Sequence, residues 1–287
     1  MISCDHGLVG KKILPALVSR KLLDVYAAVN DPDRFKPVEG VTVLKTDMGD
    51  KKAIHRTFKS KKFDRVILVV PGNRADWAEH ALAAADHTKS VKFVCVISIL
   101  TATEEETFFG DNYSDMERAA KHYFPFGYCI VRLPLLMESM IPLCAKPIKE
   151  GNSFSDPRDP NKPFRCITMD DVSNAIMNII IRPQNHEEKI YHLTGPSVTL
   201  QQQAEALSKA LGRDIALEKE DYEQYREYLE SRKVPEWQIH GTFELYRMID
   251  TGNERCNMED PGDYEKITGG KPTSLEEWCK KHVDEFK

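Results

Sequence analysis

The chain has 287 residues and a formal net charge of −5, with 41% hydrophobic and 30% charged residues. This composition is typical of a globular protein with a sizeable core, and the negative charge argues against direct contact with nucleic acid. No apolar run is long enough to span a bilayer, and the first residues lack the pattern of a signal peptide. We therefore expect a cytoplasmic protein without membrane contact.

The first ten residues resemble a damaged nucleotide-binding turn. Gly7 and Gly10 hold the last two positions of a G-x-x-G-x-x-G pattern, and Cys4 stands where the first glycine belongs. The strand that should precede the turn is reduced to Met1 and Ile2. Such a turn binds a dinucleotide because the following helix directs its first N–H groups at the pyrophosphate.

The next segments provide the context that this turn requires. Residues 11–23 carry apolar side chains at helical spacing, with Pro15 inside the predicted helix, and residues 24–29 predict a strand. Strand, turn, helix and strand then fall within about thirty residues, as in a βαβ nucleotide-binding unit.

The following segments continue to alternate between strand and helix patterns. Predicted strands cover residues 41–44, 65–70, 91–99 and 128–133, and predicted helices cover residues 51–60, 77–87 and 114–123. Continuous apolar strands fit a sheet that is buried on both faces. The fold class is therefore predicted as α/β, with a doubly wound, Rossmann-like parallel sheet.

The pattern changes after Leu133. We expect a helix over 134–149, a polar, turn-rich stretch over 151–162, a helix over 172–181 capped by Asp170 and Asp171, a short strand over 191–193, and helices opened by capping boxes at Thr199 and Ser274. The predicted domains are a Rossmann-like domain over 1–195, with a cap segment near 135–165, and a smaller, mostly helical cap region for the substrate over 196–287.

Cysteine and histidine spacing indicates neither a disulfide framework nor a metal site. The seven cysteines form no C-x-x-C pair, and the nine histidines form no H-x-x-x-H or H-E-x-x-H pattern. This usage suits free thiols in a reducing compartment. We expect no metal, and we expect Cys95 and Cys129, in apolar strands, to be inert packing residues.

Taken in order, these segments resemble the NmrA-like family of atypical short-chain dehydrogenases. Residues 3–10 stand where the family has a T-G-A-T-G-x-x-G turn, and Arg132-Leu133-Pro134 with Met137-Glu138 resembles its R-P-x-x-F-M-E-N segment. The family includes NADPH-dependent quinone and dye reductases and also redox-sensing regulators. The resemblance covers nearly the whole chain.

The resemblance implies a set of cofactor contacts in this chain. These are Ser3, Gly7, Leu8, Val9 and Gly10 at the turn, Asn30 after the second strand, Asp47 and Met48 beside the adenine, Val70, Pro71 and Gly72 along the cofactor, and Leu133 and Pro134 in the segment that resembles R-P-x-x-F-M-E-N. The implied cofactor is NADP or NAD.

Two departures from the family bear on cofactor binding. Cys4 would crowd the backbone that must approach the pyrophosphate. Asn30 stands where NADPH-binding relatives usually carry an arginine for the 2′-phosphate. Asp31 suits an unphosphorylated ribose, whereas Arg34 and Lys36 are alternative partners for a phosphate.

The usual catalytic pair, Y-x-x-x-K, is absent. The resemblance implies Tyr113 over the nicotinamide and Ser98 at the end of the fifth strand as catalytic hydrogen-bond donors. Each residue also has a plain structural interpretation, as a packed aromatic and as a strand-end cap. Glu117 takes the place of the lysine, and we expect it to pair with a nearby base or to face solvent.

Three functions remain open from the sequence. The first is an NAD(P)H-dependent reductase of a quinone-like or other small planar acceptor, because hydride transfer requires mainly positioning and a polarising donor. The second is a non-catalytic NAD(P)-sensing regulator that acts through a protein partner. The third is an inactive or truncated relative. No oligomeric state is indicated.

Overall fold

The structure is a computed structural model that describes residues 1–3, 8–104 and 106–287. The chain divides into two units. Unit 1 comprises Met1–Leu133, Val172–His192 and Lys266–Gly269, and unit 2 comprises Pro134–Asp171, Leu193–Glu265 and Gly270–Lys287. The segment near 135–165, assigned to the first domain from the sequence, thus lies in unit 2. In the described part of the chain, no helix is both long and apolar enough to cross a membrane.

Unit 1 is built on a seven-stranded sheet in the order β10-β6-β5-β4-β1-β2-β3, and every pairing is parallel. Its strands are β1 (Ile2–Ser3), β2 (Val25–Val29), β3 (Val41–Lys45), β4 (Arg65–Leu68), β5 (Phe93–Ile99), β6 (Tyr128–Leu133) and β10 (Lys189–His192). The predicted doubly wound sheet is confirmed. The strand order reverses between β1 and β4, and ligands of such sheets bind beyond the carboxyl ends of the strands at this point.

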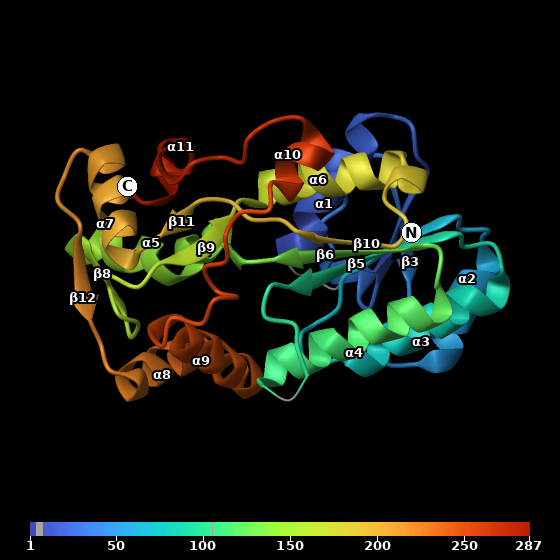
Figure 1. Cartoon of the computed structure of the whole chain (residues 1–287), viewed down its shortest axis with the longest axis horizontal. Coiled ribbons are helices and arrows are strands. Elements are labelled where there is room, and N and C mark those ends of the chain that lie inside the picture. Colours follow the sequence, from blue (N-terminus) through green and yellow to red (C-terminus); the bar gives the residue numbers. More distant parts are fainter. Residues whose placement is uncertain (4–7, 105) are drawn as a thin grey trace. The chain divides into compact units, whose positions relative to one another are not determined.

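Helices cover both faces of this sheet, as Figure 1 shows, with α1 and α6 on one face and α2, α3 and α4 on the other. They are α1 (Leu8–Ser19), α2 (Lys51–Ser60), α3 (Ala75–Thr88), α4 (Phe108–Tyr123) and α6 (Met169–Ile181), with short 3₁₀ turns η1 (Pro32–Arg34) and η3 (Pro183–Asn185). The α4 helix starts six residues earlier than predicted, because the Thr107 side chain accepts a hydrogen bond from the Gly110 backbone N–H and caps it.

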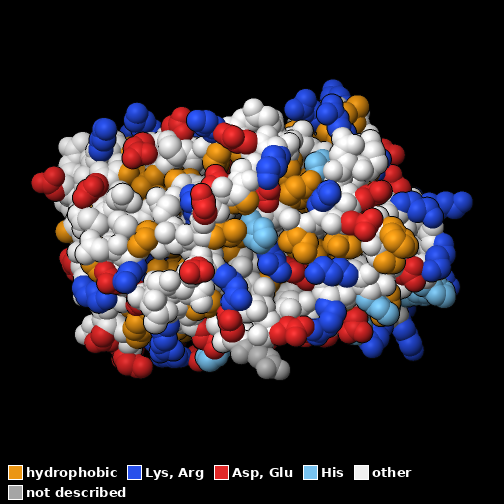
Figure 2. Space-filling view, in the orientation of Figure 1, with side chains coloured by type: hydrophobic (Ala, Val, Ile, Leu, Met, Phe, Trp, Pro, Cys, Tyr) orange, Lys and Arg blue, Asp and Glu red, His pale blue; other side chains and the backbone are white. Residues whose placement is uncertain are grey.

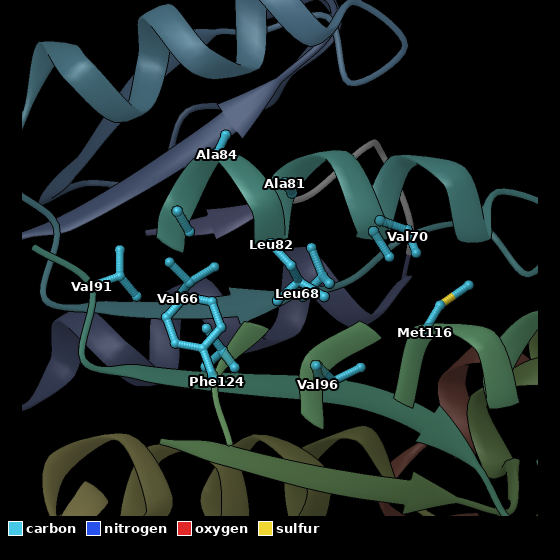
Figure 3. Packing of buried hydrophobic residues seen from close by; sticks show 14 of the residues in the cluster. Val66, Leu68, Val70, Ala81, Leu82, Ala84, Val91, Val96, Met116 and Phe124 are labelled. Atoms are coloured by element: carbon cyan, nitrogen blue, oxygen red, sulfur yellow. The ribbon is translucent and has the colours of Figure 1, made fainter. Parts of the chain in front are cut away.

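One core of unit 1 lies between the sheet and the helices α2, α3 and α4. Figure 3 shows Leu82 of α3 next to Leu68 of β4, with Met116 and Phe124 of α4 nearby. The buried alanines of α3, such as Ala81, let this helix lie close to the strands. Cys95 and Cys129 face each other in the register of β5 and β6 and are fully buried, as expected of packing residues.

Unit 2 contains two small sheets and a set of helices. The sheets have the orders β11-β9-β7 and β12-β8. Its strands are β7 (Leu135–Leu136), β8 (Ser153–Asp156), β9 (Phe164–Ile167), β11 (Ser197–Val198) and β12 (Ala216–Lys219). Its helices are η2 (Met137–Ser139), α5 (Met140–Gly151), α7 (Leu200–Leu211), α8 (Tyr222–Ser231), α9 (Glu236–Asp250), α11 (Leu275–Lys281) and η4 (Val283–Glu285), and α10 (Asp263–Thr268) spans a boundary between the units.

The helix starts of this region agree only partly with the sequence predictions. The capping boxes at Thr199 and Ser274 are both formed, as predicted. The helix predicted over 134–149 is wrong at its start, since Leu135 and Leu136 pair with β9 before the helix begins. The α6 helix begins at Met169, and the Thr168 hydroxyl rather than either aspartate caps it, accepting a hydrogen bond from the Asp171 backbone N–H.

Candidate functional site

The nucleotide-binding turn follows the shortest strand of the sheet. Ser3 is the last residue of β1, which pairs with both β2 and β4. Cys4 and Gly7 lie outside the described residues. Leu8, Val9 and Gly10 form the first turn of α1. The described strand β1 is thus followed along the chain by the start of α1, the order of strand and helix in which pyrophosphate binding occurs.

Asn30 directly follows β2 and is exposed to solvent. The neighbouring Asp31 is already engaged, because its carboxylate accepts a hydrogen bond of 3.1 Å from the backbone N–H of Asp33 and caps η1. Arg34 and Lys36 are exposed as well. The charged side chain held in place beside β2 is thus that of Asp31, and the basic side chains of this segment are exposed.

The acidic-apolar pair predicted beside the adenine sits in a compact loop after β3. Asp47 is exposed, and its carboxylate accepts a hydrogen bond of 2.8 Å from the Gly49 backbone N–H. Met48 is buried in the core of unit 1. The indole of Trp77 borders this loop, since a Cβ added at Gly49 would lie 3.5 Å from the indole nitrogen.

Trp77 was predicted only as the start of a helix, yet it joins two of the segments expected to contact the cofactor. It lies in the first turn of α3, just beyond the loop of Pro71 and Gly72. The Arg74 guanidinium stacks over its ring at 4.0 Å, and its buried indole N–H has no hydrogen-bond partner among the described residues. In the sequence, the feature that could have indicated this position is a tryptophan a few residues after Pro71-Gly72.

The loop of Val70, Pro71 and Gly72 lies against the residue predicted to be catalytic. A Cβ added at Gly72 would lie 3.0 Å from the ring of Phe109 and 3.2 Å from the ring of Tyr113. Glycine is therefore needed for this close approach of the loop to α4. Tyr113 is in the second turn of α4 and half-buried.

The Tyr113 hydroxyl is a free hydrogen-bond donor. Among the residues that the structure describes, none forms a hydrogen bond with it. Desolvation raises the pKa of Tyr113 to about 12, because the phenolate would lose hydration beside these apolar rings. The side chain thus stays protonated and able to donate across the physiological pH range.

Ser98, the second predicted catalytic residue, donates its hydroxyl elsewhere. Its Oγ lies 2.6 Å from Oε1 of Glu117, which is buried on α4. Arg132 at the end of β6 forms a two-pronged ion pair with the same carboxylate, at 2.8 and 2.7 Å. The expectation that Glu117 pairs with a base is confirmed. His192, at the end of β10, is 3.5 Å from the Arg132 guanidinium.

The last two predicted cofactor contacts lie at a boundary between the units. Leu133 ends β6, is buried, and accepts a hydrogen bond of 3.0 Å from the Leu100 backbone N–H. Pro134 is the first residue of unit 2. Glu138, in the motif that follows, is buried in unit 2 and accepts hydrogen bonds from the Met169 backbone N–H and the Trp278 indole.

The described part of the site comprises short loops at the carboxyl ends of β2, β3 and β4, together with the start of α1 and Tyr113 on α4. The sequence profile of the NmrA-like family matches residues 6–286. The chain belongs to the NmrA-like family. It has no match among curated proteins.

Solved structures share this fold at low sequence identity. The Escherichia coli NADPH-dependent quinone oxidoreductase QOR2, in complex with NADPH, has a TM-score of 0.80 at 21% identity, covering 98% of this chain and 99% of that one. Citrobacter sp. triphenylmethane reductase with NADP(H) has a TM-score of 0.80 at 16% identity and the same coverage. A mutant NmrA has a TM-score of 0.76 at 14% identity, covering 99% and 95%.

Proposed function

We propose that this protein is an NAD(P)H-dependent reductase of a quinone-like or other small planar acceptor. Two similar structures, QOR2 and triphenylmethane reductase, are named as reductases and contain NADPH or NADP(H). The observation that carries the proposal is the free hydroxyl of Tyr113 beside Gly72, in a loop at the carboxyl edge of the sheet. This edge is where open parallel sheets bind nucleotides.

The described residues fit a dinucleotide at several points. Leu8, Val9 and Gly10 open α1 and offer backbone N–H groups to a pyrophosphate. Gly72 presents backbone without a side chain, and the unpartnered indole N–H of Trp77 borders the loop of Asp47 and Met48. A bound nicotinamide would supply the hydride, and the protein would supply position and polarisation.

Tyr113 is the preferred donor to the acceptor oxygen. Its raised pKa keeps the hydroxyl protonated, so that it can donate a hydrogen bond to a carbonyl oxygen at any physiological pH. The Ser98 hydroxyl has only one proton, which it directs to Glu117. Ser98 therefore acts through Glu117, as a positioning residue for α4.

A second candidate is a regulator that binds NAD(P) and responds through a protein partner. The carboxylate of Glu117, where a catalytic lysine is usual, favours it, because an acid bound to Arg132 cannot lower the pKa of Tyr113. The similarity to NmrA is compatible with it.

The test combines turnover with binding. Oxidation of NADH and NADPH by a panel of quinones is measured for the wild type, for Tyr113→Phe and for Tyr128→Phe. The last variant is the control, because Tyr128 lies at the amino end of β6. Removing one aligned donor typically costs about 10²–10³ in turnover, so we expect this loss for Tyr113→Phe alone. Cofactor affinity, followed by nicotinamide fluorescence, should stay unchanged because the ring still packs on Gly72.

The outcomes separate the candidates. Robust turnover that is equal in the wild type and Tyr113→Phe would contradict the role of Tyr113. Cofactor binding without turnover on any acceptor would favour the regulator. Absent binding of both nucleotides would favour an inactive relative.

A further inference from the structure

Unit 1 carries an open groove between the helices α2 and α3. This α2–α3 groove has a volume of about 640 Å³. It is lined by Lys51, Lys52, His55 and Arg56 of α2, by Glu79, His80, Ala83, Ala84 and His87 of α3, and by Tyr123 of α4. Figure 2 shows Lys, Arg and His side chains gathered on the surface over α2 and α3.

The rim of the groove is positive although the chain is negative overall. Lys51, Lys52 and Arg56 face one carboxylate, Glu79, in a chain whose net charge is −5. Among the described residues neither lysine forms an ion pair, and Arg56 has only a distant one, at 3.9 Å from Asp50. The groove therefore concentrates cationic charge that the protein itself leaves uncompensated.

Three histidines add donors to this surface. The rings of His55 and His87 lie 4.9 Å apart on neighbouring helices. The Nδ1 atom of His80 is buried and has no hydrogen-bond partner within the described part of the chain. Because this atom is shielded from solvent, a ligand in the open groove would meet only the rest of the His80 ring.

The floor of the groove is apolar. Ala83 and Tyr123 expose carbon surface between the charged walls. A free inorganic anion would gain nothing from this floor, whereas a peptide with both carboxylate and apolar side chains would match floor and rim together. We propose that the α2–α3 groove binds an acidic, amphipathic segment of a protein partner. The groove lining includes none of the residues assigned to the cofactor, so the proposal does not rest on the reductase activity.

Binding should strengthen as the pH falls. The pKa of His55 is lowered by desolvation and by the nearby charges of Lys59 and His87. The pKa of His80 is lowered by desolvation and by the charge of Lys51. Both imidazoles are therefore mostly neutral at neutral pH. The charged and titratable groups around them are Lys51, Lys52, Arg56 and Lys59 on α2, Arg74, Asp76, Glu79 and His87 at α3, and Tyr123 on α4. Carboxylates of the partner would favour the protonated rings, so the complex takes up protons.

The experiment measures fluorescence anisotropy of a short, fluorescein-labelled peptide of glutamate and leucine against the full chain. A matched peptide of lysine and leucine is the charge control. The variant Lys51→Glu/Lys52→Glu reverses the charge of two lysines on the rim. The variant Lys61→Glu/Lys62→Glu makes the same charge change at exposed lysines outside the groove. We expect affinity for the acidic peptide to fall about tenfold in the first variant and to change less than about twofold in the second.

Two further measurements define the occupant. Affinity in the wild type should rise as the pH falls below about 6.5, the ordinary histidine pKa from which both values are lowered, and His80→Gln should reduce this rise. The proposal is overturned if the acidic peptide does not bind at the lower pH, or if both double variants weaken it equally. It is also overturned if a single-stranded oligonucleotide displaces the peptide at lower concentration through the same two lysines, since the partner would then be a nucleic acid.

Discussion

Tyr113 and Glu117 lie one turn apart on α4, yet their polar groups have different surroundings. The Tyr113 hydroxyl is free and its pKa is raised to about 12, whereas the Glu117 carboxylate is buried and bound by Ser98 and Arg132. A tyrosine with this pKa gives up its proton only in strong base. Activity that depends on its donation should therefore persist through alkaline pH and decline only as the pH approaches about 12.

Cofactor preference can be tested at a single residue, Asn30. An arginine at this exposed position would meet a 2′-phosphate through a charge-assisted hydrogen bond worth about 1.5–3 kcal/mol, or roughly one to two powers of ten in affinity. We expect the wild type to discriminate weakly or to prefer NADH, and Asn30→Arg to shift the preference toward NADPH. Nicotinamide fluorescence titrations with both nucleotides measure this, with Asn30→Gln as the uncharged control.

A wild type that already prefers NADPH a hundredfold would refute this prediction. Arg34 or Lys36, both exposed in the same loop, would then be the phosphate partner. Charge reversal at each of these residues would identify which one it is.

The sequence predicted some residue neighbours at the site but not others. It associated Gly72 and Tyr113 with one site, and the structure brings their atoms to within van der Waals contact. It did not identify Arg132 as the partner of Glu117, because that contact depends on how α4 packs on β6. Nor did it identify Trp77, whose place beside Gly49 follows from the packing of α3.

At the scale of elements, α5 contains a proline whose missing hydrogen bond is replaced by a neighbouring helix. Pro147 lies inside α5 and has no N–H to donate to the carbonyl of Leu143. The hydroxyl of Tyr228, on α8, donates to this carbonyl at 2.7 Å. Arg232, one turn further along, donates to the Pro142 carbonyl at 3.0 Å. The two helices are thus joined at the backbone of α5.

A double-mutant cycle tests this link. Tyr228→Phe leaves the half-buried Leu143 carbonyl without its donor and should lower the free energy of unfolding by about 1 kcal/mol. In a Pro147→Ala background the helix supplies its own donor, so the same change should cost clearly less. Urea unfolding followed by circular dichroism gives the four values. Equal costs in both backgrounds would show that the hydroxyl acts independently of the proline.

Which elements could be predicted depends on how they are buried. The strands of unit 1 are continuous apolar runs, such as Phe93–Ile99, and such runs indicate a buried parallel sheet directly. The strand Ser153–Asp156 was missed because it is only four residues long and Phe154 is its single apolar residue. The sequence pattern predicts a helix at Leu135 and Leu136. In the structure these residues instead pair with β9, a strand that comes later in the chain.

At the scale of the whole molecule, each unit has its own core, and the chain passes between them repeatedly. The last helix, α11, supplies Trp278 to the core of unit 2, where its side chain is 1% exposed. The Trp278 ring packs edge-on against Phe286, and its indole N–H donates to the buried Glu138 carboxylate at 3.3 Å. Residues at positions 138 and 278 are thus parts of one core.

Truncating this ring should destabilise the protein strongly. We expect Trp278→Ala to lower the free energy of unfolding by about 3–5 kcal/mol, because it leaves a cavity and removes a donor from a buried carboxylate. Phe126→Ala is the control, since that ring is 75% exposed and its loss should change stability by less than about 0.5 kcal/mol. Thermal and urea unfolding midpoints measure both. Similar shifts for the two variants would contradict the assignment of Trp278 to the core.

The interleaving of the two units has a consequence for synthesis on the ribosome. Unit 1 cannot add β10 to the edge of its sheet until residue 192 has left the exit tunnel, by which time the first segment of unit 2 has long been exposed. The core of unit 2 is complete only after Trp278 has been synthesised. Its apolar strands and helices are therefore unprotected through most of translation, when exposed apolar surface promotes aggregation. The nascent chain should be a client of chaperones that bind before release, and slow translation after residue 134 would prolong its exposure.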